Sequence, residues 1–209
     1  IAHAGGMIDG KSYTNTLDAL NESYKKGFRM FELDIIKTSD NHFVACHDWE
    51  TWKILSEFQG DVPPSLEEFK KYKILCKYTT LDMNGINNWF GTHYDAFLIT
   101  DKVNSPKEFA SCFIDKKRLI MELFSWEAVD EALNNNINAM PTWDIIEQIK
   151  GDKIKYLKNK GIKYVAASRN ILIDRYFDLI NMKKAGIKVY AFHVNNENGR
   201  DEAYMICHE

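Results

Sequence analysis

The sequence predicts an α/β protein whose 209 residues form a single domain, a (β/α)8 TIM barrel. Three observations predict this fold: apolar runs of strand length alternate with helical segments, three helix-to-strand joints share one design, and the composition does not change along the chain. The length is at the lower end for this barrel, which typically needs about 250 residues. A doubly wound open sheet is the alternative, although no GxGxxG turn follows the first apolar run.

Each of the three joints contains a lysine-rich helix end, a glycine and a short apolar run. The joints are KKGFRMFELD, KNKGIKYVAA and KKAGIKVYAF, which begin at Lys25, Lys158 and Lys183. Lysine is favoured at the negative end of a helix dipole, and glycine readily adopts the left-handed conformation that ends a helix. Three joints of this kind favour a parallel sheet.

Helices are expected to begin at capping residues between the apolar runs. The sequences at Ser65 and Ser105 read as capping boxes, and Pro106 suits the first position of the second helix. Asn15 or Thr16 is expected to begin the first helix. Eight strands are expected: Ile1–Ala4, Met30–Ile35, Phe43–His47, Ala96–Asp101, Leu119–Phe124, Ile137–Pro141, Tyr164–Ala167 and Val189–Val194.

Charge and hydropathy exclude two broad classes of protein. The net charge is −3, and only five of the 27 basic residues are arginine. A nucleic-acid-binding protein is expected to carry a basic, arginine-rich face, so no nucleic-acid partner is predicted. No apolar run reaches the length of about 18 residues that a transmembrane helix needs, so no transmembrane segment is predicted. The sequence does not indicate an oligomeric state.

The four cysteines bear on the cellular compartment. They form no CxxC pair, which excludes a zinc ribbon and a thioredoxin-type motif. We expect free, buried thiols, which fit a reducing compartment and favour a cytoplasmic location. The chain begins inside an expected strand, so it is expected to be trimmed at its termini, and a removed signal peptide is the alternative.

Three acidic residues occupy the carboxyl ends of expected strands, where barrels carry their functional groups. Glu32 and Asp34 are two residues apart on one strand and therefore face the same side, and Asp101 ends a later strand. Acids within an apolar strand are costly unless they are paired or bind a metal, whereas on an exposed edge strand they would have no functional meaning. Three carboxylates without a thiolate suit one divalent cation, Mg²⁺ or Ca²⁺.

Two histidines also lie at expected strand ends. His3 and His47 are candidates for acid–base catalysis, because imidazole titrates near neutral pH; a hydrogen-bonded core histidine is the alternative reading of His47. Three further candidates to contact a substrate are Lys102, Glu122 and His193, of which His193 could equally belong to the core. Lys102 can reach the carboxyl end of the barrel only if its strand ends or bulges at Asp101, since adjacent strand residues face opposite sides.

Five segments in order resemble the glycerophosphodiester phosphodiesterase family. That family usually shows His-Arg-Gly, Pro-Glu-Asn-Thr, Glu-x-Asp, Thr-x-Asp-Gly and His-Asp at similar spacing. The corresponding segments here are His3-Ala-Gly, Tyr13-Thr-Asn-Thr16, Glu32-Leu-Asp34, Thr38-Ser-Asp40 and Val44-Ala-Cys-His-Asp48. The run from Pro64 to Phe69 and the run from Val189 to Asn195 resemble a helix start and the last strand of the family.

The resemblance implies a barrel of the phospholipase-C-like phosphodiesterase type that hydrolyses glycerophosphodiesters to an alcohol and glycerol phosphate. It implies that His3 and His47 act as acid and base. Glu32 and Asp34 would hold the metal, and Asp101 stands nearest to the third family ligand. Asn15 matches the family asparagine and is a candidate for substrate binding.

Two positions differ from the family pattern. Ala4 stands where the family has arginine, and the family lysine falls at Val103, with Lys102 next to it. Two alternatives therefore stay open: a phospholipase-type phosphodiesterase, which would need an apolar rim, and a non-catalytic barrel that binds phosphate ligands.

Overall fold

The computed structural model describes residues 1–192, in which strands and helices alternate within two compact units. The first unit comprises Ile1–Met121, and the second begins at Glu122. Among the helices of residues 1–192, none is both long enough and apolar enough to cross a membrane.

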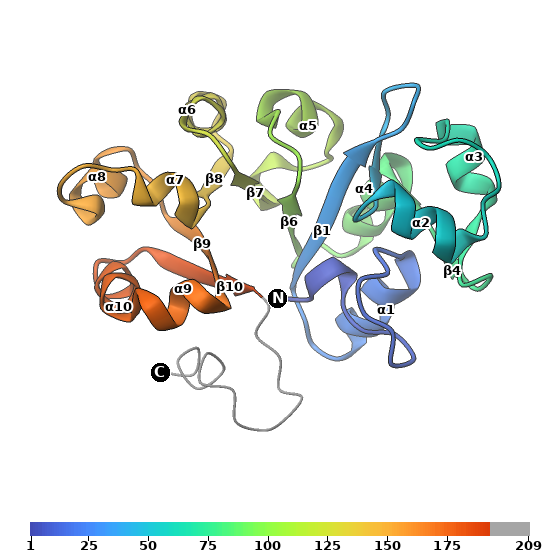
Figure 1. Ribbon diagram of the computed structural model, residues 1–209, viewed down its shortest axis with the longest axis horizontal. Coiled ribbons are helices and arrows are strands. Elements are labelled where there is room, and N and C mark those ends of the chain that lie inside the picture. The colour runs from blue at the N-terminus through green and yellow to red at the C-terminus, as the bar shows by residue number, and fades with distance from the viewer. Residues whose placement is uncertain (193–209) are drawn as a thin grey trace. The chain divides into compact units, whose positions relative to one another are not determined.

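The sheet of the first unit has the strand order β5-β2-β1-β6-β7. Figure 1 labels its strands β1, β6 and β7. Strand β1 (Met30–Lys37) pairs in parallel with β6 (Phe97–Asp101), which pairs in parallel with β7 (Leu119–Leu123). On the other side of β1, β2 (Phe43–Ala45) is antiparallel to it and also pairs with β5 (Leu81–Asp82). The register places Asp34 opposite Asp101.

The other elements of the first unit surround this sheet. They are the 3₁₀ helices η1 (His3–Gly5) and η2 (Lys116–Arg118), the helices α1 (Leu17–Lys25), α2 (Trp49–Ser56), α3 (Leu66–Lys71), α4 (Met83–Thr92) and α5 (Pro106–Cys112), and the hairpin of β3 (Lys73–Ile74) and β4 (Tyr78–Thr79). The Thr16 side chain caps α1, and Ser65 forms the expected capping box with Glu68. Helix α5 begins at Pro106 as predicted, but the Ser105 side chain makes no capping bond.

The first unit has a main core and a smaller aromatic cluster. In the main core, Phe31, Leu33 and Ile35 on β1 are almost completely buried. The smaller cluster, here called the α2 cluster, is centred on the stacked rings of Trp52 and Phe69, whose centroids are 5.4 Å apart. Its other buried members are Val44, Cys46, Phe58, Ile74 and Tyr78. Burial of each large side chain contributes about 1.5–3 kcal/mol, so this cluster stabilises the segment that follows β2.

The second unit continues the alternation of strands and helices. Its strands are the end of β7, β8 (Asn138–Pro141), β9 (Tyr164–Ser168) and β10 (Lys188–Phe192), of which β9 and β10 are parallel. Its helices are α6 (Trp126–Asn134), α7 (Trp143–Glu147), α8 (Lys153–Asn159), α9 (Arg169–Asp174) and α10 (Tyr176–Lys184). Gly161 and Gly186 have φ angles of 78° and 86°, as the predicted joints require.

The predictions for two of the strands are wrong in their extent, and one of the two is also wrong in its direction. Only Ala2 of Ile1–Ala4 pairs with β1, in a single parallel bridge to Phe31; the chain then turns at Ala4, whose φ is 49°. The expected strand Phe43–His47 ends at Ala45 and is antiparallel to β1. The connection from β1 to β2 is too short for a parallel crossover, which needs a dozen or more residues. The last expected strand extends to Val194, and its residues 193 and 194 lie outside the described part of the chain.

Candidate active site

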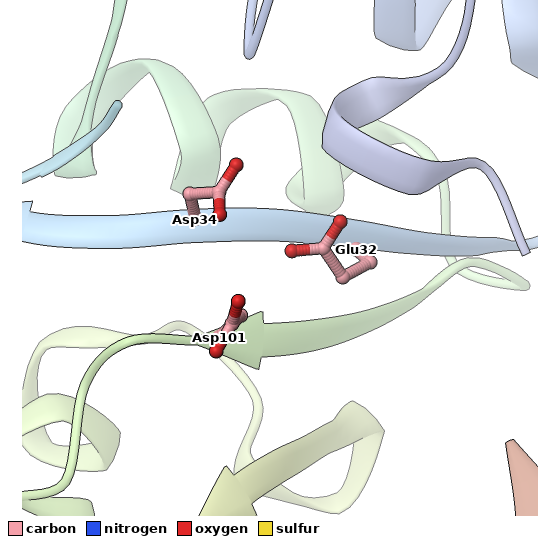
Figure 2. A group of neighbouring side chains, drawn as sticks. All are labelled: Glu32, Asp34 and Asp101. Atoms are coloured by element: carbon pink, nitrogen blue, oxygen red, sulfur yellow. The ribbon is translucent and has the colours of Figure 1, made fainter. Parts of the chain in front are cut away.

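The three acidic residues predicted from the sequence lie together at the ends of two neighbouring strands. Figure 2 shows Glu32 and Asp34 on β1 and Asp101 at the end of β6. One carboxylate oxygen of each lies within 4.8 Å of the others. The two-residue spacing places Glu32 and Asp34 on one face of β1, and the strand register brings Asp101 beside Asp34.

The surroundings of these carboxylates favour a cation. Glu32 is 8% exposed and Asp34 only 1% exposed. Burial raises the pKa of Asp101, and the charge of Asp34 raises it further, against a hydrogen bond from the Lys102 N–H and the positive charge of Lys102. Three carboxylates at this separation repel one another, so a divalent cation would offset the cost. Carboxylate oxygens are the ligands that Mg²⁺ and Ca²⁺ prefer, so the donor set fits such an ion.

Asn15 holds Asp34 in place through two hydrogen bonds. Its Nδ2 donates to Asp34 Oδ2 at 2.8 Å, and its Oδ1 accepts from the Asp34 N–H at 3.1 Å. Asn15 is buried and has a φ of 51°, a left-handed conformation that asparagine tolerates better than most residues. Its side-chain amide therefore orients one carboxylate of the cluster.

His3 lies beside Glu32 on the turn η1. Its Nε2 is 3.6 Å from Glu32 Oε2, and the same carboxylate oxygen accepts the backbone N–H of Ala4 at 2.7 Å. The His3 ring packs edge-on against the Tyr13 ring, with centroids 5.0 Å apart. The left-handed turn at Ala4 thus places an imidazole next to the acidic cluster.

His47 follows β2, whose end is held next to the cluster because the Cys46 N–H donates to the Asp34 carbonyl at 2.8 Å. His47 Nδ1 is 2.6 Å from Asp48 Oδ2, and Asp48 Oδ1 accepts the Thr51 N–H at 2.7 Å at the start of α2. Partial burial acts to raise the pKa of Asp48, but the hydrogen bonds from His47 and Thr51 lower this pKa to about 2. A charged carboxylate therefore orients the imidazole and leaves Nε2 as the nitrogen that can meet a substrate.

Lys102 can reach the carboxyl end of its strand only if the strand ends or bulges at Asp101, and the structure meets this condition. Strand β6 ends at Asp101, and Lys102 has a φ of 67°, so the alternation of the strand is broken there. Its N–H donates to Asp101 Oδ1 at 2.5 Å, and its charge acts on the carboxyl group of Asp101. Ala4, completely buried, has no charge to offer in this region.

Of the two remaining candidates, one belongs to the second unit and one lies outside the described residues, and one partner was missed. Glu122 lies on β7 in the second unit, and His193 lies outside the described residues. Asp48, the partner of His47, is not among the site residues predicted from the sequence. The sequence does contain a signal for Asp48. An aspartate directly before an amphipathic segment is a typical helix cap, and Asp48 caps α2 by accepting the Thr51 N–H.

A comparison with family models shows to which known proteins this chain is related. The model of the Glycerophosphoryl diester phosphodiesterase family matches residues 9–169, which is most of the sequence. The chain belongs to this family. Membership of the glycerophosphoryl diester phosphodiesterase family confirms the resemblance predicted from the His3 to Asp48 segments. A comparison with curated proteins finds no significant match.

Solved structures of glycerophosphodiester phosphodiesterases share the fold. A phosphodiesterase from Oleispira antarctica, in complex with the product sn-glycerol-3-phosphate, is similar over 99% of this chain and 87% of its own, with a TM-score of 0.71 and 17% identity. The Parabacteroides distasonis enzyme has a TM-score of 0.67 and 15% identity over 88% and 79% of the two chains. The Thermotoga maritima enzyme has a TM-score of 0.65 and 19% identity over 91% and 82%. The predicted α/β fold of TIM-barrel type is thereby confirmed.

Proposed function

We propose that this member of the phosphodiesterase family hydrolyses glycerophosphodiesters to an alcohol and glycerol phosphate, with residues 1–209 acting as one catalytic domain. The observation that carries the proposal is the group of three carboxylates within 4.8 Å of one another, with His3 beside Glu32. The His47–Asp48 pair follows Cys46, whose N–H donates to the Asp34 carbonyl. Carboxylates alone would repel an anionic phosphodiester. Glu32, Asp34 and Asp101 would hold a divalent cation, and with that cation the same group would attract the phosphodiester.

The donor set supports an ion of the class of Mg²⁺ and Ca²⁺. When bound, such an ion stabilises negative charge on the phosphoryl oxygens. The protein residues have complementary tasks: Asn15 fixes Asp34, the Ala4 N–H fixes Glu32, and the Lys102 N–H fixes Asp101. The Lys102 ammonium group supplies a further positive charge for the phosphate, in the region where Ala4 supplies none.

The two histidines act as the base and the acid of the reaction. One imidazole accepts a proton from the attacking water as its oxygen bonds to phosphorus. The bond between phosphorus and the alcohol oxygen breaks, and the other imidazole donates a proton to that oxygen, so that water is consumed and an alcohol and glycerol phosphate are released. The Asp48 carboxylate favours this role for His47 because its hydrogen bond to Nδ1 fixes the orientation of the imidazole.

The test is a hydrolysis panel of glycerophosphodiesters and phospholipids after treatment with EDTA, with Mg²⁺ or Ca²⁺ added back. We expect turnover of glycerophosphodiesters only with an added ion, and loss of that turnover in Glu32→Gln but not in the control Glu50→Gln, which changes an exposed residue of α2. Hydrolysis of phospholipids alone would contradict the substrate class. Full activity in EDTA would contradict the role of the ion, and no turnover of any diester with either ion would contradict the function.

A further inference from the structure

Tyr13 has a backbone conformation that a bulky residue rarely adopts. Its φ is 61°, in the left-handed region that is costly for a residue with a large side chain and is used mainly by glycine, asparagine and aspartate. Tyr13 stands where the family segment Pro-Glu-Asn-Thr has its proline. Proline fixes φ at about −65° and could not adopt this conformation, so this chain builds the turn in its own way.

The turn is held in place on both sides of Tyr13. Before it, Asp9 accepts two hydrogen bonds from side chains of the β3–β4 hairpin. After it, the Asn15 N–H donates to the Ala4 carbonyl at 3.0 Å, and the Asn15 side chain makes two hydrogen bonds with Asp34. A costly backbone conformation persists only where its surroundings determine it in this way, and such residues cluster at functional sites.

The held turn places the Tyr13 ring against the imidazole of His3. The two ring centroids are 5.0 Å apart, and the planes are inclined at 83°. Aromatic rings attract one another in this edge-on geometry. The His3 side chain is 37% exposed, so without a neighbouring ring the solvent would leave it room for other rotamers. The Tyr13 ring therefore restricts the imidazole to the rotamer in which Nε2 is 3.6 Å from Glu32 Oε2.

A role in packing alone does not account for Tyr13. Its side chain is 43% exposed, so it adds little to the core, while its backbone lowers the stability of the protein. Glycine or asparagine would form the same turn at a smaller cost. The contact with His3 is the feature of Tyr13 that neither of these residues could supply.

We infer that Tyr13 is a positioning residue for His3: its ring holds the imidazole beside Glu32, where the phosphodiester would bind, and Tyr13 itself transfers no proton. This inference rests on the proposed hydrolysis by His3 and His47. Proton transfer requires the imidazole to lie within hydrogen-bond distance of the reacting oxygen, so a displaced ring would lower kcat. Substrate binding, which the acidic cluster and Lys102 would provide, would change little.

The test compares three variants by steady-state kinetics on a glycerophosphodiester, with Mg²⁺ or Ca²⁺ added. Tyr13→Asn removes the ring but suits the left-handed backbone, so its melting temperature should not fall. We expect its kcat to fall about 10–100-fold and its KM to change by less than about threefold. Tyr13→Phe keeps the ring, so its kcat should stay within about twofold of the wild type. Tyr94→Asn is the matched control and should leave kcat unchanged, because Tyr94 is 79% exposed and lies between α4 and β6.

Addition of Tyr13→Asn to His3→Ala shows whether the ring acts through His3. If it does, the residual kcat of His3→Ala should not fall further in the double variant. An equal further fall in that background would overturn the inference, and so would an unchanged kcat in Tyr13→Asn alone or an equal fall in Tyr13→Phe.

Thermal unfolding separates the positioning of His3 from support of the turn. A Tyr13→Asn variant that unfolds, or that melts several degrees below the wild type, would show that the ring supports the turn itself and would overturn the inference. In each of these cases turnover by the wild type would leave the proposed function standing. If the wild type hydrolyses no diester with either ion, the proposed function fails and the inference fails with it.

Discussion

Asp101→Asn tests whether the acidic cluster is a destabilising feature that a metal ion relieves. The change removes one negative charge from three that lie within 4.8 Å of one another, and it keeps an oxygen that accepts the Lys102 N–H. Two unit charges 4.8 Å apart repel by about 3.5 kcal/mol at an effective dielectric constant of about 20. Asp101 is partly exposed and lies beside the charge of Lys102, so we expect about 1–2 kcal/mol of this repulsion to be recovered as stability.

The assay is thermal unfolding in EDTA and then with increasing Mg²⁺. In EDTA, Asp101→Asn should unfold about 2–8 °C above the wild type, because a chain of this length gains about 2–4 °C per kcal/mol. At 100 times its dissociation constant an ion stabilises the wild type by about 2.7 kcal/mol, and the variant should lose most of that response. The control Glu50→Gln should change the free energy of unfolding by less than about 0.5 kcal/mol and keep the response to Mg²⁺. A variant that melts at or below the wild-type temperature in EDTA, or that responds to Mg²⁺ as the wild type does, would refute the reasoning.

Three further predictions concern the histidines and the lysine. His3→Ala and His47→Ala should each lower kcat by about 10²–10⁴-fold with little change in melting temperature; a loss of stability typical of a core cavity would instead indicate a packing role. Asp48→Asn keeps a good helix cap but removes the charge beside His47. We expect kcat to fall in steady-state assays while α2 stays folded. An unchanged kcat would show that the pairing of Asp48 with His47 has no role in catalysis. Because the pKa of Asp48 is lowered to about 2, its stabilising effect is present above about pH 4 and is lost as the pH falls toward 2, so acid titrations of unfolding should be flatter in this variant. Lys102→Ala should reduce kcat/KM by more than tenfold. Lys70→Ala changes a half-exposed side chain that pairs with Asp82, and it should have almost no effect; equal effects of the two changes would remove Lys102 from the site.

The acidic cluster is the part of the site that the sequence predicts best. Two facts are sufficient: the spacing of Glu32 and Asp34 within an apolar strand, and a second apolar strand that ends in Asp101. Parallel pairing of these strands then brings the three carboxylates together. The contact between Asn15 and Asp34 could not be predicted in this way, because it depends on a left-handed residue in an irregular loop.

The region around His47 was harder to predict because it departs from the repeated design. The apolar run before His47 looks like another parallel strand, but the short connection after β1 makes it the return strand of a hairpin. The segment that follows contains the two-residue strands β3, β4 and β5, which are too short to show any periodicity. Its structure depends on the α2 cluster, whose rings come from residues that are distant in sequence.

The two parts of the candidate site are supported by different portions of the first unit. Glu32, Asp34 and Asp101 lie on the central strands β1 and β6, whose apolar residues Phe31, Leu33 and Leu98 are completely buried. His47 depends on β2, α2 and the α2 cluster, which form a smaller body of hydrophobic contacts. Segments with fewer buried contacts open at a lower free energy than the centre of a domain does. Opening of the α2 cluster alone would therefore displace His47, the proposed acid or base, while the three carboxylates on β1 and β6 stay in place, so we expect warming to abolish hydrolysis before it abolishes the binding of Mg²⁺.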